Sequence, residues 1–160
     1  MLSVRLICVG KLKEKFYREA CAEYEKRLKA YCKLEILELT EQRLPENPAP
    51  ALIQSALAKE AEAIRQKIPQ GSAVIAMCIE GKPLSSEGLA DRITAITGGG
   101  ISRICVLIGG SCGMDEALKQ SADLRLSMSP MTFPHHLARV MVLEQIYRAL
   151  NIAAGGKYHK

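Results

Sequence analysis

Three short segments of the sequence have compositions suited to holding a small ligand, and each follows an apolar run that predicts a β-strand. They are residues 77–82, 108–113 and 127–135. The second contains Gly-Gly-Ser-Cys-Gly, but neither the Gly-Lys-Ser/Thr of a phosphate-binding loop nor the glycine spacing of a dinucleotide-binding turn. Alone, such a loop is as consistent with a tight turn as with a cofactor loop. Because ligands bind at the carboxyl ends of strands in open α/β sheets, the three segments together form the candidate site.

The third segment is unusually apolar for a loop. It holds Met128, Met131 and Phe133 together with two prolines. An exposed loop with this much apolar surface would be costly, so we expect it to fold against something. The residues leave open whether that is the protein core, a ligand or a second subunit.

Few titratable side chains are placed for catalysis by the sequence alone. Tyr158 and His159 lie at the end of the chain, where a disordered tail is the plainer interpretation. Glu144 and Arg148 are four residues apart in an expected helix and should pair with each other. The six cysteines form no Cys-x-x-Cys motif, and no cysteine–histidine cluster has the spacing of a metal site, so no metal centre is predicted.

The positive charge is confined to one end of the chain. The formal net charge is +5, and residues 1–33 hold nine Lys and Arg against four Glu, whereas residues 34–160 hold thirteen charges of each sign. A local positive surface concentrates polyanions such as RNA near it. The plainer interpretation of the same residues is a solvated helix face.

Strand-like and helix-like patterns alternate along the whole chain. We expect strands at residues 4–9, 33–39, 73–79, 101–108 and 124–127, helices at 13–28, 51–67, 85–96, 114–120 and 137–150, and a turn at 80–83. This alternation predicts an α/β fold, with a mostly parallel sheet flanked by helices. The length of 160 residues fits a single domain, residues 1–160.

Hydropathy indicates the location of the protein and its oligomeric state. No apolar stretch approaches the roughly 20 residues that cross a bilayer, and the apolar start is too short for a signal peptide, so we expect no membrane contact and a cytoplasmic location. The expected helix at 137–150 is apolar on two faces, which favours a homodimer in a domain this small. One face takes Val140, Leu143, Tyr147 and Leu150, and the other takes Leu137, Met141 and Val142.

Several motifs, in their order and spacing, resemble those of one family, the bacterial ribosomal large-subunit pseudouridine N3-methyltransferases (RlmH) of the SPOUT, or α/β-knot, class. The motifs are Val9-Gly10-Lys11-Leu12-Lys13, Gly81-Lys82-Pro83-Leu84-Ser85-Ser86, Ile108-Gly109-Gly110, Met131-Thr132-Phe133-Pro134-His135, Glu144-Gln145-Ile146-Tyr147-Arg148-Ala149 and Tyr158-His159. The resemblance covers essentially the whole chain. It implies a C-terminal trefoil knot, which runs against general folding rules and which no periodicity indicates.

The resemblance also implies a cofactor and a substrate. The cofactor is S-adenosylmethionine, and the substrate is N3 of a pseudouridine in 23S rRNA of the assembled ribosome, with no role for DNA. The basic first fifth of the chain would then meet rRNA phosphates. By the same resemblance, the cofactor would be held by Met77, Gly109, Met128, Ser129, Pro130, Met131, Thr132 and Phe133.

Catalysis would need more than a cofactor cavity. N3 of the base carries a proton at neutral pH, so methyl transfer requires alignment of the reacting atoms and a proton acceptor. On the resemblance, we expect His159 to act as base, Tyr158 to help orient the target and Arg139 to lie near the uracil oxygens. His135 is expected to shape the loop. Cys78 and Cys112 stand where the family more often has polar or acidic residues.

Other functions remain compatible with these residues. A knotted methyltransferase could act on a different RNA target, and a non-catalytic nucleotide-binding or rRNA-binding module could keep the same fold. A metal-dependent hydrolase is a more distant alternative, because no carboxylate pair is convincingly placed.

Overall fold

A five-stranded sheet forms the centre of the protein, with its strands in the order β2-β1-β4-β3-β5. The computed structural model describes residues 1–160. The strands are β1 (Leu2–Val9), β2 (Cys32–Leu39), β3 (Ala73–Pro83), β4 (Arg103–Ile108) and β5 (Leu124–Ser127). Every pair of neighbouring strands is parallel, which confirms the predicted fold class.

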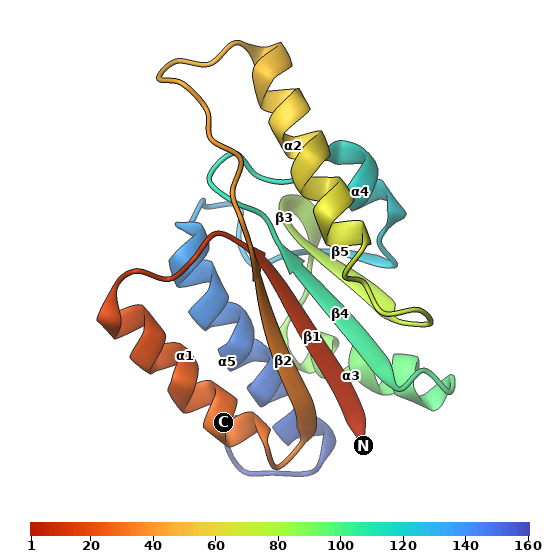
Figure 1. Ribbon diagram of the computed structural model, residues 1–160. Coiled ribbons are helices and arrows are strands. Elements are labelled where there is room, and N and C mark those ends of the chain that lie inside the picture. The colour runs from red at the N-terminus through yellow and green to blue at the C-terminus, as the bar shows by residue number, and fades with distance from the viewer.

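Helices cover both faces of this sheet (Figure 1). They are α1 (Lys15–Leu28), α2 (Pro50–Arg65), α3 (Ser86–Gly98), α4 (Glu116–Ser121) and α5 (His135–Ala153). On β1, Leu6 and Cys8 pack in the layer that contains α1, α3 and α5, whereas Ile7 and Val9 pack with α2 and α4. Both faces of β4 are therefore buried, as expected for an inner strand of a parallel sheet.

Helix α5 lies against both α1 and α3. Its inner face includes Val142, Leu143, Ile146 and Leu150, which are all buried. The predicted division into two apolar faces is therefore wrong in detail, because Val142 shares the inner face with Leu143 while Tyr147 is only half-buried. None of the helices combines the length and the apolar character needed to cross a bilayer.

The segment at 80–83 also differs from the prediction. Instead of ending in a turn, β3 continues to Pro83, and Met77 and Lys82 both pair with Leu126 of β5. Residues 78–81 therefore bulge out of the ladder between these two pairings. Bulges re-aim side chains beside sites, and this one turns the end of β3 toward the loops that follow β4 and β5. The trefoil knot stays a prediction.

Gly81 lies in this bulge and provides a test of the close approach of β3 to β5. A Cβ at this position would lie 2.8 Å from the carbonyl carbon and oxygen of Arg125, so backbone would have to move. Gly81→Ala should destabilise the fold by about 1–3 kcal/mol, the usual cost of overpacking. At about 2–4 °C per kcal/mol, this lowers the melting temperature measured by calorimetry by several degrees.

Gly98→Ala is the matched control, because a Cβ there meets nothing within 4 Å. Equal melting temperatures for the two variants would contradict the close approach of β3 to β5.

Candidate functional site

The carboxyl ends of β3, β4 and β5 open into a cavity of about 650 Å³. The loop at 128–134 and the first turns of α5 form its remaining wall. The predicted cofactor residues line it with the exception of Pro130, and they come from three strand ends that are far apart in sequence. Its lining residues are Met77, Cys78, Ile79, Glu80, Ile108, Gly109, Gly110, Ser111, Gly113, Met114, Lys119, Leu126, Met128, Ser129, Met131, Thr132, Phe133, Pro134, His135, Ala138 and Val142.

The glycine loop after β4 folds tightly on itself. The Gly113 N–H donates to the Gly110 carbonyl at 3.1 Å, and a Cβ on Gly109 would overlap the carbonyl of Gly113. Glu41, from the segment after β2, accepts hydrogen bonds from the Ser111 N–H at 2.8 Å and from Ser111 Oγ at 2.6 Å. The loop can therefore close on itself only because residue 109 has no side chain. This role is additional to the expected approach of the backbone to a ligand.

The apolar loop at 128–134 is only partly folded onto the protein. Met128 packs against the core, whereas Met131 is 73% exposed at the cavity wall. Ser129 Oγ accepts a hydrogen bond from the Met131 N–H at 2.9 Å, which fixes the turn between them. Apolar surface thus remains available to a ligand or a partner.

One wall of the cavity carries charge. Lys119 Nζ lies 2.5 Å from Glu80 Oε1 and 3.0 Å from Glu116 Oε2. Burial alone would lower the pKa of Lys119, but the hydrogen bonds from these two carboxylates outweigh it and raise the pKa. The bond from Lys119 likewise holds the pKa of Glu80 below its usual value. Both groups are therefore charged at neutral pH, and they pair with each other at the cavity wall.

Arg139 lies beside the cavity without lining it. Its guanidinium is almost fully buried and donates to Glu38 Oε2 at 2.6 Å and to the Gly10 carbonyl at 3.0 Å. Burial alone would raise the pKa of Glu38, but the bonds from Arg139 and from the Leu12 N–H outweigh it and lower the pKa. This contact fastens the first turns of α5 to the ends of β1 and β2. The predicted role of Arg139 near a base stays a prediction.

His135 begins α5 and lines the cavity, as expected for a residue that shapes the loop. Burial, followed by the neighbouring His136, lowers its pKa. Its ring approaches Gly10, since a Cβ there would lie 3.5 Å from His135 Nε2. The imidazole is therefore largely neutral at physiological pH.

The C-terminal tail, for which disorder was the plainer interpretation, lies against α5 and α3, away from the cavity lining. Tyr158 Oη donates to Glu144 Oε1 at 3.1 Å, and the Arg148 guanidinium lies 4.5 Å from the Tyr158 ring centre. His159 Nε2 lies 2.6 Å from Glu87 Oε1. The expected Glu144–Arg148 pair is present at 2.6 Å. Within one chain, neither Tyr158 nor His159 lines the cavity.

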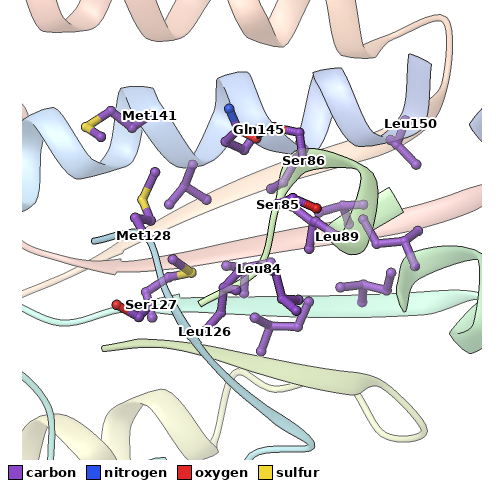
Figure 2. A pocket seen from close by; sticks show the side chains of 18 of the residues that line it. Leu84, Ser85, Ser86, Leu89, Leu126, Ser127, Met128, Met141, Gln145 and Leu150 are labelled. Atoms are coloured by element: carbon purple, nitrogen blue, oxygen red, sulfur yellow. Dashed lines mark hydrogen bonds between the residues drawn. The ribbon is translucent and has the colours of Figure 1, made fainter. Parts of the chain in front are cut away.

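A second cavity, of about 350 Å³, lies between the sheet and the pair α3 and α5 (Figure 2). Fifteen of its nineteen lining residues are hydrophobic, and its polar edge is a hydrogen bond of 2.7 Å from Ser86 Oγ to Gln145 Oε1. The two cavities share walls, so they are neighbours under α5. The shared residues are Met77, Leu126, Met128 and Val142.

Comparisons with known proteins agree with this architecture. The sequence model of one family, described as "Predicted SPOUT methyltransferase", matches residues 2–159. A probable methylase family protein from Haemophilus influenzae superposes with a TM-score of 0.55 and 14% identity over all of this chain and 72% of that one. A probable methyltransferase from Bordetella pertussis gives 0.55 and 14% over 93% and 96% of the two chains. The fold is thus that of a SPOUT methyltransferase.

Relatives with higher sequence identity point to one family within this class. The ribosomal RNA large subunit methyltransferase H of Bifidobacterium adolescentis is 50% identical over 159 residues, which cover 99% of this chain and all of that protein. The protein of the same name from Streptococcus equi subsp. zooepidemicus is 43% identical over the same share of both chains. The chain belongs to the ribosomal RNA large subunit methyltransferase H family.

Sequence reasoning missed five lining residues outside the quoted loops, Met114, Lys119, Leu126, Ala138 and Val142. Lys119 lies on the short helix that follows the glycine loop, and Ala138 and Val142 are one helical turn apart on α5. Helical spacing from His135 would have placed Ala138 and Val142 on the side of α5 that faces the loop.

The Arg139–Glu38 contact can be tested through its pH dependence. Because the folded state lowers the pKa of Glu38, the carboxylate stabilises the fold above its unfolded pKa of roughly 4.3 and loses this effect as pH falls through the folded value. Glu38→Gln should cost about 2 kcal/mol at pH 7, less than for a fully buried pair because Glu38 is one-third exposed. The difference in unfolding free energy from the parent protein, measured with denaturant, should shrink below about pH 4.

Glu35→Gln on the same strand is the control, because its exposed pair with Arg5 is expected to contribute less than about 1 kcal/mol. If the loss of unfolding free energy in Glu38→Gln is small at pH 7, or stays constant down to pH 3, the Arg139–Glu38 pair does not hold the start of α5 against β1 and β2.

Proposed function

We propose that the protein transfers the methyl group of S-adenosylmethionine to N3 of a pseudouridine in large-subunit rRNA, acting in the cytoplasm as a homodimer on the assembled ribosome. The observation that carries the proposal is the cavity at the carboxyl ends of β3, β4 and β5, which gathers all the predicted cofactor residues except Pro130 from separate segments. Family membership supports the same activity, since the relatives carry the name of an rRNA methyltransferase.

The cavity suits this cofactor in size and in chemistry. Its volume of about 650 Å³ lies within the range of roughly 300–1,000 Å³ typical of sites for ligands of this size. Met77, Met128 and Phe133 offer apolar walls for adenine. Lys119 and Glu80 offer opposite charges to the carboxylate and ammonium of the methionine portion. When bound, the sulfonium supplies an electrophilic methyl group.

The groups proposed for catalysis must reach the target from outside the cavity of their own chain. Tyr158 and His159 are held on α5 and α3, so we assign them to the cavity of the second subunit. Burial, followed by the bond to Glu144, raises the pKa of Tyr158, which therefore stays a phenol that can donate to the uracil oxygens. His159 would accept the N3 proton. Val140 and Met141 on α5 are only half-buried within one chain, which leaves part of their apolar surface for dimer contact.

Arg139 contributes indirectly in this arrangement. Both its hydrogen-bond partners belong to the protein, and its side chain is only 4% exposed. It would act on the target through the segments that it joins, which are Gly10, the end of β2 and the start of α5.

Methyl transfer can be measured directly. Protein, radiolabelled S-adenosylmethionine and ribosomes from cells that lack this modification are combined, and the RNA is digested for mass spectrometry. We expect one methyl group at N3 of a pseudouridine in the large-subunit rRNA. Gly109→Ala should lose transfer and donor binding, because its Cβ collides with Gly113, whereas Gly98→Ala should keep both.

Label on another nucleotide would replace the proposed target with a different RNA. Donor binding or RNA binding without transfer would instead support a non-catalytic module.

The tail gives a separate prediction. Deleting Tyr158–Lys160 should abolish turnover, since loss of a general base alone commonly costs 10²–10⁴-fold in rate. The affinity for S-adenosylmethionine, measured by calorimetry, should stay unchanged, because none of these residues lines the cavity of its own chain and the partner's tail is assigned to the RNA target. Deleting Lys160 alone is the control and should leave turnover intact. Full activity without Tyr158 and His159 would refute their assignment.

A further inference from the structure

A row of aromatic rings leads away from the mouth of the cofactor cavity. His135 lines the cavity, and its ring centre lies 4.1 Å from that of His136. His136 lies 6.2 Å from Tyr17, and Tyr17 lies 4.4 Å from Phe16. We call these four residues the aromatic row. It joins the start of α5 to the start of α1, which are 118 residues apart in the chain at their nearest members.

Packing of the protein core does not account for the outer end of this row. Phe16 is 63% exposed, and the residues that α1 buries are Cys21 and Leu28. Tyr17 supports the Phe16 ring from one side and contacts His136 with its own ring. An exposed ring held in place by a second ring presents a fixed flat surface to a partner.

Cations surround this surface. Lys11, Lys13, Lys15 and Arg18 all lie on the loop before α1 or on its first turn, and all are exposed. Only Lys15 has a carboxylate partner, Glu19 at 3.6 Å. Arg18 Nη1 donates to the Lys13 carbonyl at 2.9 Å, which holds this loop against α1. The carboxylate of Glu14 meets the row at His136 Nδ1, 3.7 Å away.

Two helix N-termini meet at the same place (Figure 1). Neither α1 nor α5 has a side-chain cap, and neither carries an acidic residue in its first turn. Free backbone N–H groups and the helix dipoles therefore add partial positive charge to that of the lysines. Together with the rings, this favours a partner that is both anionic and flat.

We propose that the aromatic row is a stacking site for an unpaired base of the RNA, next to the nucleotide that enters the cavity, with the adjoining phosphates held by Lys11 and Lys13. This inference rests on the proposed function and names how its RNA is held. Aromatic side chains stack with any base because every base has a π-face, and cations along the backbone provide the remaining attraction. A second protein subunit would find this surface less complementary, because charged residues are depleted from the centre of protein interfaces.

Substitutions of Phe16 test stacking. Phe16→Ala should raise the KM for unmodified ribosomes about tenfold or more, with kcat and the affinity for S-adenosylmethionine unchanged. Phe16→Trp should keep the parent KM, and Phe16→Leu, which is apolar but cannot stack, should behave like Phe16→Ala. The control is Leu52→Ala, which removes a 49%-exposed apolar side chain from α2.

Direct binding separates this proposal from the proposed function. The probe is a stem-loop RNA with 2-aminopurine at an unpaired position, whose fluorescence falls when the base stacks. The parent protein should quench it and Phe16→Ala should not. Lys13→Ala should reduce the slope of log affinity against log salt by about one, while Phe16→Ala leaves that slope unchanged.

Three results would overturn the stacking site. These are parent-like quenching and KM in Phe16→Ala, parent-like values in Phe16→Leu, and a Phe16→Ala protein whose subunits dissociate in sedimentation while its monomers still quench the probe. Quenching that depends on Phe16, found in a protein that transfers no methyl group to RNA, would refute the proposed function while supporting the stacking site.

Discussion

The buried guanidinium of Arg139 is the constraint on which the candidate site depends. A charge removed from water is tolerated only when its donors are satisfied, and Arg139 finds a carboxylate at the end of β2 and a carbonyl just after β1. These partners and α5 come from three separate parts of the chain. Once they are joined, the start of α5 is fixed relative to the carboxyl edge of the sheet. Because the loop at 128–134 leads into α5, the fixed start of this helix restricts the path of the loop, which closes over the ends of β3 and β4.

Glu41 extends this constraint to the glycine loop. Its two bonds to Ser111 tie the segment after β2 to the loop after β4, on the far side of β1. Glu38 at the end of β2 and Glu41 just after it thus hold different walls of the same site. Burial would by itself raise the pKa of Glu41, but the bonds from Ser111 lower it, so both carboxylates remain ionised when the site is formed. The rim is accordingly a network of charge-assisted bonds around an apolar cavity.

The sequence predicts the layers well because the signal for them is local. The apolar run at Ile104–Ile108 predicts an inner strand wherever it is placed, and the alternation of patterns predicts helices on both faces. Glu80-Gly81-Lys82-Pro83 has the composition of a turn, yet pairing with β5 resumes at Lys82, and that partner lies more than forty residues further along the chain. Long-range pairing therefore decides what local composition cannot.

The contrast between local signals and long-range contacts also explains which features of the site residues can be predicted. Arg139 is three residues before Val142 and four before Leu143, so helical spacing places it on the buried face, where an arginine needs a carboxylate. The sequence contains that signal but not the identity of the partner, Glu38. The sequence contains no such signal for the order of the C-terminal tail, because its contacts with Glu144 and Glu87 are made by polar side chains of a kind that any solvated tail contains.

The chemistry of the rim also separates two kinds of recognition. Inside the cavity, apolar walls and the flexible thioethers of Met77 and Met128 favour a ligand through buried area, which depends little on salt. Outside it, cations and two helix N-termini without side-chain caps would attract phosphates through charge, which salt screens. His135 belongs to both regions, since it lines the cavity and begins the aromatic row. On the two proposals made here, a change of RNA target requires new residues on α1 and the loop before it, whereas the cavity assigned to the methyl donor can stay as it is.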